Sequence, residues 1–118
     1  MRAKRVYEFH QTGDPLKSLE LGKYSMLIHQ LEDLIVTKLS TIFKTPKDKI
    51  TFIWKGKIIF LFVPKFRQND MAECNFHKVA EPDINNLLKG HNKKPYYSYS
   101  YYNVAGGFEL CIDFHKVL

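Results

Sequence analysis

The sequence has few cysteines and no long apolar runs. Only Cys74 and Cys111 occur among its 118 residues, so the chain can form one disulfide at most, and free thiols are the expected state in a reducing compartment. The longest apolar run, Ile58 to Val63, is far too short to cross a bilayer. The N-terminal residues Met1 to His10 are charged and lack a following apolar stretch, which argues against a secretory signal. We therefore expect a soluble protein of the cytoplasm.

Signature motifs of common enzyme classes are also missing. The chain contains no Gly-x-x-x-x-Gly-Lys phosphate loop, no Gly-x-Ser-x-Gly elbow and no His-Glu-x-x-His zinc motif. Cys111, Asp113 and His115 include the residue types of a thiol nucleophile site, and their spacing puts them on one face of a strand. Side chains two positions apart on a strand lie ~6–7 Å from each other, beyond hydrogen-bond reach unless they bend together. We therefore expect no catalytic residues, no enzymatic activity and no cofactor.

Four residues of the types that bind zinc occur in two pairs, Cys74-x-x-His77 and Cys111-x-x-x-His115. Each pair has a spacing that could hold a metal ion. The pairs lack the tight Cys-x-x-Cys knuckle of structural zinc sites, so we favour the alternative in which Cys74 packs as a small apolar residue and the histidines lie at the surface. The sequence thus predicts no metal site.

Positive charge predominates in this chain. Eighteen Lys and Arg residues stand against twelve Asp and Glu residues, a net charge of +6, which favours anionic partners such as a nucleotide, nucleic acid or an acidic protein surface. A soluble basic domain without such a partner is the alternative. The chain is 45% apolar and 14% aromatic, which is enough for one core, and its length predicts a single domain over residues 1–118.

Apolar residues at helical spacing predict a long amphipathic helix over about residues 24–43. Asp14-Pro15 marks an earlier helix start, because Asp can cap a helix and Pro is tolerated in its first turn. A shorter helix is expected over about residues 82–89, entered at Pro82 and ended by Gly90. The apolar positions of the long helix are Tyr24, Leu27, Ile28, Leu31, Leu34, Ile35, Leu39 and Ile42, and its polar side carries mostly His29, Gln30, Glu32, Asp33, Thr37 and Lys38.

Residues 50–54 and 57–63 are rich in β-branched and aromatic side chains, which predicts a hairpin that turns at Lys55-Gly56. Along 57–63 both alternating sets of side chains are apolar, so both faces of this strand require burial. One long helix covers only one face of a sheet. Another element or a second subunit must cover the other face, and we expect a homo-oligomer.

Two further strands are expected at residues 96–102 and 108–115, joined by a turn at 103–107. Residues 74–79 could form another strand, whereas the polar residues 67–70 before them are typical of a loop. The predicted fold class is therefore α+β, with the long helix (about 24–43) and the short helix (about 82–89) packed on an antiparallel sheet of four to five strands.

Five of the seven tyrosines fall within residues 96–102, directly after the basic stretch 89–95. Aromatic rings stack on nucleic-acid bases and nearby lysines meet phosphate, so the region predicts a surface for an anionic ligand. The alternative is that Tyr97, Tyr99 and Tyr101, which share one face of the strand, pack beneath a helix or at a subunit interface. The predicted ligand-binding residues are Arg67, Lys93, Lys94, Tyr96, Tyr97 and Tyr99.

A resemblance to known proteins is confined to the opening of the chain, about residues 9–30. This part resembles a segment near the start of small uncharacterised accessory proteins of tailed bacteriophages, in which an aromatic residue, Asp-Pro, Leu and Gly recur before a helix. The resemblance implies a phage accessory protein that acts in the cytoplasm of a bacterial host, where proteins of this size often inhibit host defences. It brings no catalytic residues. The residues that carry it are Phe9-His10-Gln11-Thr12-Gly13-Asp14-Pro15-Leu16-Lys17-Ser18-Leu19-Glu20-Leu21-Gly22.

Two functions follow from these expectations. The first is a non-catalytic binding protein, a phage accessory or counter-defence protein that captures a nucleotide-like anionic ligand or a host protein. The second is a structural or nucleic-acid-associated phage protein that uses its positive charge on DNA or RNA. The expected partners are therefore an anionic ligand or an acidic host protein, with no role for a membrane.

Overall fold

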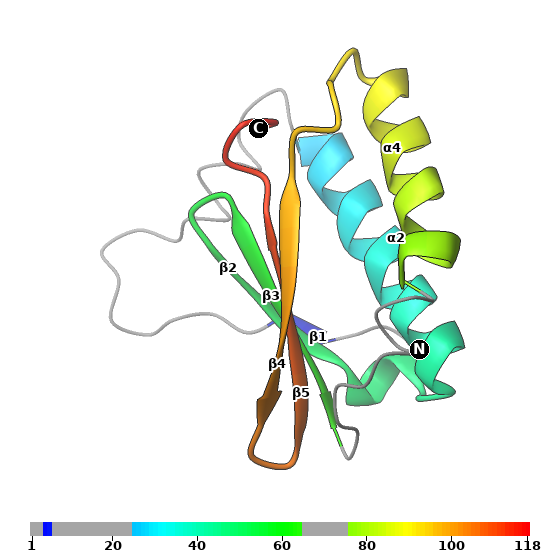
Figure 1. Cartoon of the computed structure of the whole chain (residues 1–118), viewed down its shortest axis with the longest axis vertical. Coiled ribbons are helices and arrows are strands. Elements are labelled where there is room, and N and C mark those ends of the chain that lie inside the picture. The colour runs from blue at the N-terminus through cyan, green and yellow to red at the C-terminus, as the bar shows by residue number, and fades with distance from the viewer. Residues whose placement is uncertain (1–3, 6–24, 65–75) are drawn as a thin grey trace.

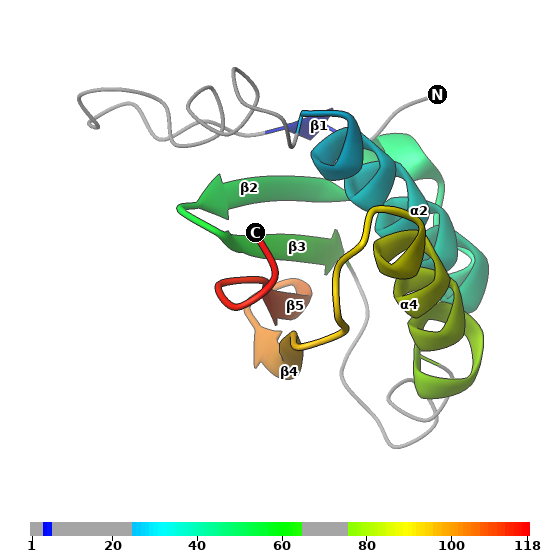
Figure 2. The ribbon, with the colours of Figure 1, turned by 90° about the horizontal axis from the view of Figure 1, so that it is seen from above.

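The computed structural model describes residues 4–5, 25–64 and 76–118. This part of the chain has an α+β architecture of two layers, in which two α-helices lie on one face of a sheet (Figures 1 and 2). The predicted fold class is confirmed at this level. The elements in chain order are β1 (Lys4–Arg5), α2 (Ser25–Phe43), a 3-10 turn (Lys47–Lys49), β2 (Thr51–Lys55), β3 (Ile58–Pro64), a π-helical turn (Phe76–Ala80), α4 (Glu81–Gly90), β4 (Ser98–Val104) and β5 (Gly107–Asp113).

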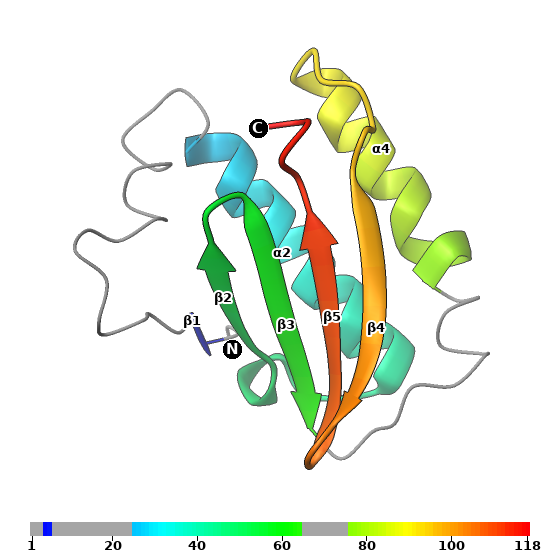
Figure 3. The same ribbon diagram turned by 60° about the vertical axis from the view of Figure 1, so that its left-hand side comes forward.

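The five strands lie in the order β1-β2-β3-β5-β4, and all neighbours are antiparallel except β1, which runs parallel to β2. Two hairpins form most of the sheet. The hairpin of β2 and β3 turns at Gly56, whose φ of 61° lies in the left-handed region that glycine adopts without steric cost. Because β4 and β5 are antiparallel neighbours, the start of β4 lies next to the end of β5 (Figure 3).

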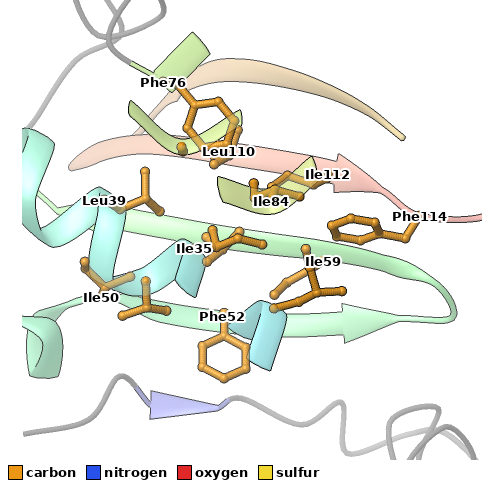
Figure 4. Packing of buried hydrophobic residues seen from close by; sticks show 14 of the residues in the cluster. Ile35, Leu39, Ile50, Phe52, Ile59, Phe76, Ile84, Leu110, Ile112 and Phe114 are labelled. Carbon is orange, nitrogen blue, oxygen red and sulfur yellow. The ribbon is translucent and has the colours of Figure 1, made fainter. Parts of the chain in front are cut away.

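The core lies between the sheet and the two helices. One side of α2 is buried through Leu31, Ile35 and Leu39, because these positions recur at helical spacing, and α4 adds Ile84 and Leu88. Figure 4 shows several of these side chains pointing toward the buried face of the sheet. Burying each such side chain is worth on the order of 1.5–3 kcal/mol before the loss of conformational entropy is subtracted. The helices are therefore held mainly by apolar packing.

The opposite face of the sheet carries neither of the two described α-helices (Figure 2). The residues of β3 alternate as expected, so that Ile59 and Leu61 are fully buried beneath the helices while Phe60 on the other face is only half-buried. Strand pairing places Ile53 on one side of Phe60 and Cys111 on the other. Among the described residues, the apolar part of this open face is thus only partly removed from water.

Several boundaries differ from those predicted. Strand β4 begins at Ser98 and continues to Val104, because Val104 still pairs with Gly107 and leaves a tighter turn than the one expected at 103–107. The possible strand at 74–79 is wrong for its described part, where residues 76–80 form a π-helical turn that leads into α4. The helix expected to begin at Asp14-Pro15 lies outside the described residues.

Candidate functional site

The connection from α4 to β4 is fixed by a hydrogen-bonded helix end. The N–H of Lys93 donates to the Leu88 carbonyl at 2.8 Å, and the N–H of Asn92 donates to the Lys89 carbonyl at 3.0 Å. Asn92 has a φ of 60°, the left-handed conformation that this type of helix end requires. Gly90, predicted to end the helix, is still helical, and Asn92 takes the role instead because asparagine tolerates this conformation better than most residues. The chain therefore leaves α4 and turns back toward the sheet.

The residues that follow this turn form an exposed aromatic surface with a cation beside it. The Tyr96 side chain is 59% exposed, and the ammonium of Lys94 lies 5.8 Å from the centre of its ring. A backbone bond from the Tyr96 N–H to the Lys94 carbonyl, 2.8 Å long, holds the two residues close. A ring in this position offers an open face for stacking together with a positive charge.

Tyr97 turns inward from the same segment. Its hydroxyl donates to the Asn85 side-chain carbonyl on α4 at 2.8 Å, and its ring lies 5.5 Å from that of Phe114, measured between ring centres. Burial raises the pKa of the Tyr97 hydroxyl, and the negative charge of Glu81 raises it further. Tyr97 is therefore a fixed neutral donor that ties the start of β4 to α4.

An open groove of about 530 Å³ lies where β4 begins and β5 ends. The groove is half open to solvent, so a molecule bound in it would keep part of its surface exposed. The chain after β5 lies beside the start of β4 at this end of the sheet (Figure 3). The groove combines aromatic rings, a hydroxyl, a carboxylate, an imidazole and an ammonium, supplied by Tyr96, Tyr97, Ser98, Asp113, His115 and Lys116.

The segment after β5, which forms one wall of the groove, is held in place by contacts on its buried side. Val117 and Leu118 are buried, and their N–H groups both donate to the Phe114 carbonyl at 2.9 Å. The Lys57 ammonium donates to the backbone oxygen of Leu118 at 2.9 Å. These contacts leave the exposed His115 and Lys116 on the groove side.

Asp113 is also held in place within the groove. One of its carboxylate oxygens accepts a hydrogen bond from the backbone N–H of His115 at 2.8 Å. Strand pairing puts Ser98 directly opposite Asp113, so both side chains lie on the same face of the sheet. The carboxylate and the hydroxyl are therefore neighbours in the groove.

Tyr99 takes part in packing beneath α4 and the π-helical turn. Its hydroxyl donates to the Glu81 carboxylate at 2.9 Å and contacts the ring of His77, and its own ring lies 4.8 Å from that of Phe76. His77 is also bonded to Glu81, at 2.8 Å. This cluster joins β4 to the start of α4, and Tyr99 does not line the groove.

The structure thus brings together only part of the predicted ligand-binding set. Tyr96 and Tyr97 line the groove, and Lys94 contacts the ring of Tyr96. Lys93 lies at the end of α4, and Arg67 falls outside the described residues. Sequence reasoning missed Ser98, Asp113, His115 and Lys116 as groove residues. The polar side of the strand carrying Asp113 and His115 was visible in the sequence, but its pairing with Ser98 was not.

No group of three or more His, Cys, Asp or Glu side chains in the described part of the chain is placed to hold a metal ion. Cys111 lies on the open face of the sheet and His115 lies in the groove, while Cys74 falls outside the described residues. Burial raises the pKa of the Cys111 thiol, as do the charges of Glu109 and Asp113, against a smaller opposing effect of a hydrogen bond from Ser100.

Comparison of this chain with protein-family models, with curated proteins and with solved structures finds no match in any of the three. In the part of the chain that the structure describes, neither helix has the length and apolar character that crossing a membrane requires. The groove and its chemistry are therefore the basis for a functional assignment.

Proposed function

We propose that this protein is a non-catalytic binding protein that captures a nucleotide-like anionic ligand in the groove where β4 begins and β5 ends. The observation that carries the proposal is the composition of the groove, which Tyr96 and Tyr97 line together with the exposed His115 and Lys116. Such a combination suits a ligand that has both a flat ring and a negative charge. Recognition of a flat ring and a negative charge involves no chemical reaction, so we expect the ligand to be bound unchanged.

Each end of such a ligand has a partner in the groove. The exposed ring of Tyr96 supplies a stacking surface, and stacking of a base on an aromatic side chain contributes roughly 1–3 kcal/mol. Lys116 supplies a positive charge for a phosphate, and Lys94 adds a second charge beside the tyrosine ring. The net charge of +6 also raises the local concentration of anions around the protein.

The biological setting that we propose is a phage accessory or counter-defence protein in the cytoplasm of a bacterial host. The resemblance of residues 9–30 to phage accessory proteins supports this setting, although these residues lie largely outside the described part of the chain. Capture of a nucleotide-like ligand would act by removing that ligand from the host. An acidic host protein is the other partner that the positive charge would suit.

Titration calorimetry with nucleoside monophosphates tests the binding proposal. The variant carrying both Lys93→Ala and Lys94→Ala should bind the ligand more weakly while its free energy of unfolding falls by no more than about 0.5 kcal/mol. The matched control carries Lys47→Ala and Lys49→Ala, which remove the same charge from the 3-10 turn at the other end of the sheet (Figures 1 and 3). Equal affinities of the two variants would show that Lys93 and Lys94 do not contribute to binding, and no binding of any nucleotide would reject the proposal.

The second function, a nucleic-acid-associated or structural phage protein, is favoured by the same positive charge. The dependence of binding affinity on salt concentration distinguishes it from the first function. Affinity that rests on many phosphate contacts falls steeply with salt, with a slope set by the number of phosphates neutralised. We therefore expect a shallow salt dependence for a mononucleotide. Tighter binding of single- or double-stranded DNA, with a slope of several phosphates, would favour the second function instead.

The proposal includes self-association through the open face of the sheet. Phe60 and Ile53 on this face are only half-buried in a single chain, although both are large apolar residues. A second copy of the chain that packs on this face would remove these two side chains from water. A homodimer is therefore the assembly that we expect.

A further inference from the structure

We propose that the groove selects guanine among the nucleotide bases, with Asp113 accepting hydrogen bonds from the Watson–Crick edge of the base. This inference rests on the proposed function and names the ligand class of the same site. Its starting point is the presence of a carboxylate in a groove that we expect to take an anion. A negative charge there opposes binding of a phosphate, so Asp113 must meet a different part of the ligand.

The carboxylate is oriented and still able to accept further hydrogen bonds. The bond from the His115 N–H uses one oxygen of Asp113, whereas an ionised carboxylate has about four acceptor positions on its two oxygens. Ser98 lies directly opposite on β4 and adds a hydroxyl that can either donate or accept. The groove therefore presents a rigid acceptor with a small adjustable group beside it.

An acceptor of this kind discriminates among the bases. Guanine carries two adjacent donors on its Watson–Crick edge, the ring N1–H and the 2-amino group, and the two oxygens of a carboxylate can accept both. Adenine and cytosine present one amino group next to an unprotonated ring nitrogen, which repels the second oxygen. Uracil presents a single N–H between two carbonyl oxygens. Guanine is therefore the base that matches Asp113.

The other residues of the groove suit the rest of a guanine mononucleotide. The exposed ring of Tyr96 can stack on the purine, and Lys116 can meet the phosphate. The groove, about 530 Å³ and open to solvent, leaves room for one nucleotide. The ligand that we infer is thus a guanine mononucleotide, held by its base edge at Asp113 and by its phosphate at Lys116.

Calorimetric titration of the full chain with GMP, IMP and AMP at one salt concentration tests this inference. IMP has the same ring system, the same 6-oxo group and the same N1–H as GMP, and it lacks only the 2-amino group. We expect GMP to bind roughly tenfold more tightly than IMP, as for loss of one hydrogen bond to a charged group, and AMP to bind more weakly than IMP. Equal affinities of GMP, IMP and AMP would overturn the guanine assignment while leaving the proposed function intact.

The variant Asp113→Asn identifies the residue responsible. Its side-chain oxygen can still accept from the His115 N–H, so the local geometry is retained, but the amide cannot accept two adjacent donors. Affinity for GMP should fall about tenfold or more, and the preference for GMP over IMP should disappear. A variant that keeps the full preference overturns the role of Asp113. If the variant does not fold, the ratio of GMP to IMP affinity in the unmodified protein still decides the base preference.

Two further outcomes distinguish failure of the proposed function from failure of the mononucleotide assignment. Absence of binding by every nucleotide rejects the proposed function together with this inference. A guanine-containing tetranucleotide that binds more tightly than GMP, with a steep salt dependence, overturns the mononucleotide assignment and favours a single-stranded nucleic acid.

Discussion

The indole N–H of Trp54 donates a hydrogen bond to the carboxylate of Glu32 at 2.7 Å, and this bond joins β2 to α2 inside the core. Glu32 is only 6% exposed, which is unusual for a carboxylate. His29 also approaches it, with 3.3 Å between its Nδ1 and the other carboxylate oxygen. A buried carboxylate is strongly unfavourable without hydrogen-bond donors, so the position of Trp54 makes the burial of Glu32 tolerable.

Replacing Trp54 with Phe should therefore destabilise the fold. The variant removes a donor from a buried carboxylate, and leaving such a group without its donor costs roughly 1–3 kcal/mol. Urea denaturation at neutral pH should show this decrease in the free energy of unfolding. The double variant Trp54→Phe, Glu32→Leu should recover part of the loss, because no buried charge is left behind. Additive effects of the two substitutions would contradict the coupling.

Gly107 offers a second stability test at the start of β5. A Cβ atom at this position would lie 2.1 Å from the backbone oxygen of Val63 and 2.9 Å from the Cα of Pro64, so β3 and β5 would have to separate. We expect Gly107→Ala to lower the free energy of unfolding by about 3 kcal/mol, at the upper end of overpacking effects. The control Gly90→Ala, at a helical position with no atom within 4 Å of the added Cβ, should be neutral or stabilising by up to about 1 kcal/mol. Similar losses in both variants would contradict this explanation.

The fold was predictable where local pattern and packing agree. The strand at 57–63 alternates with apolar residues on both faces, and the structure places β3 at Ile58–Pro64 with that alternation preserved. Glu32 shows the limit of such reasoning. Helical spacing assigned it to the polar side of α2, but the structure buries it because a donor arrives from β2, a partner 22 positions away in the sequence. Spacing within one element carries no information about such a partner.

The candidate site shows the same limit in another form. The density of tyrosines drew attention to residues 96–102, yet only Tyr96 and Tyr97 reach the groove, because Tyr99 packs against the π-helical turn and α4. Asp113 enters the groove through its pairing with Ser98 across two strands. Pairing depends on the register of the whole sheet, and a single sequence specifies that register only through tertiary packing.

The buried hydroxyl of Tyr97 makes stability depend on pH at the alkaline end. Burial and then the charge of Glu81 raise the pKa of this hydroxyl above the ordinary tyrosine value of about 10. The folded state therefore favours the neutral hydroxyl, so the stabilisation is fully present below about pH 10 and is lost as the pH rises above it. The urea midpoint of the unmodified protein should fall between pH 9 and pH 11 by more than that of Tyr97→Phe. Parallel pH profiles of the two proteins would exclude this contribution of Tyr97.

The open face of the sheet leads to a test of assembly. Phe60 lies at its centre between Ile53 and Cys111, so a lysine at this position would place a charge in the middle of the proposed contact. We expect light scattering at micromolar concentration to give twice the chain mass of 13.9 kDa for the unmodified protein and the mass of one chain for Phe60→Lys. The control Thr41→Lys adds the same charge at an exposed position of α2 and should remain dimeric.

The labelling rate of the Cys111 thiol measures whether the same face is covered while the face itself carries no substitution. With Cys74 replaced by Ser, labelling by a thiol reagent at pH 8 monitors Cys111 alone, and it should be slow because burial and the charges of Glu109 and Asp113 raise the pKa of this thiol. If a second copy covers the face, the labelling rate should fall further as protein concentration rises through the dissociation constant, and Phe60→Lys should abolish that dependence. A rate that does not change with concentration would mean that the thiol is protected within a single chain. Together with a monomeric mass, such a result would exclude the homodimer.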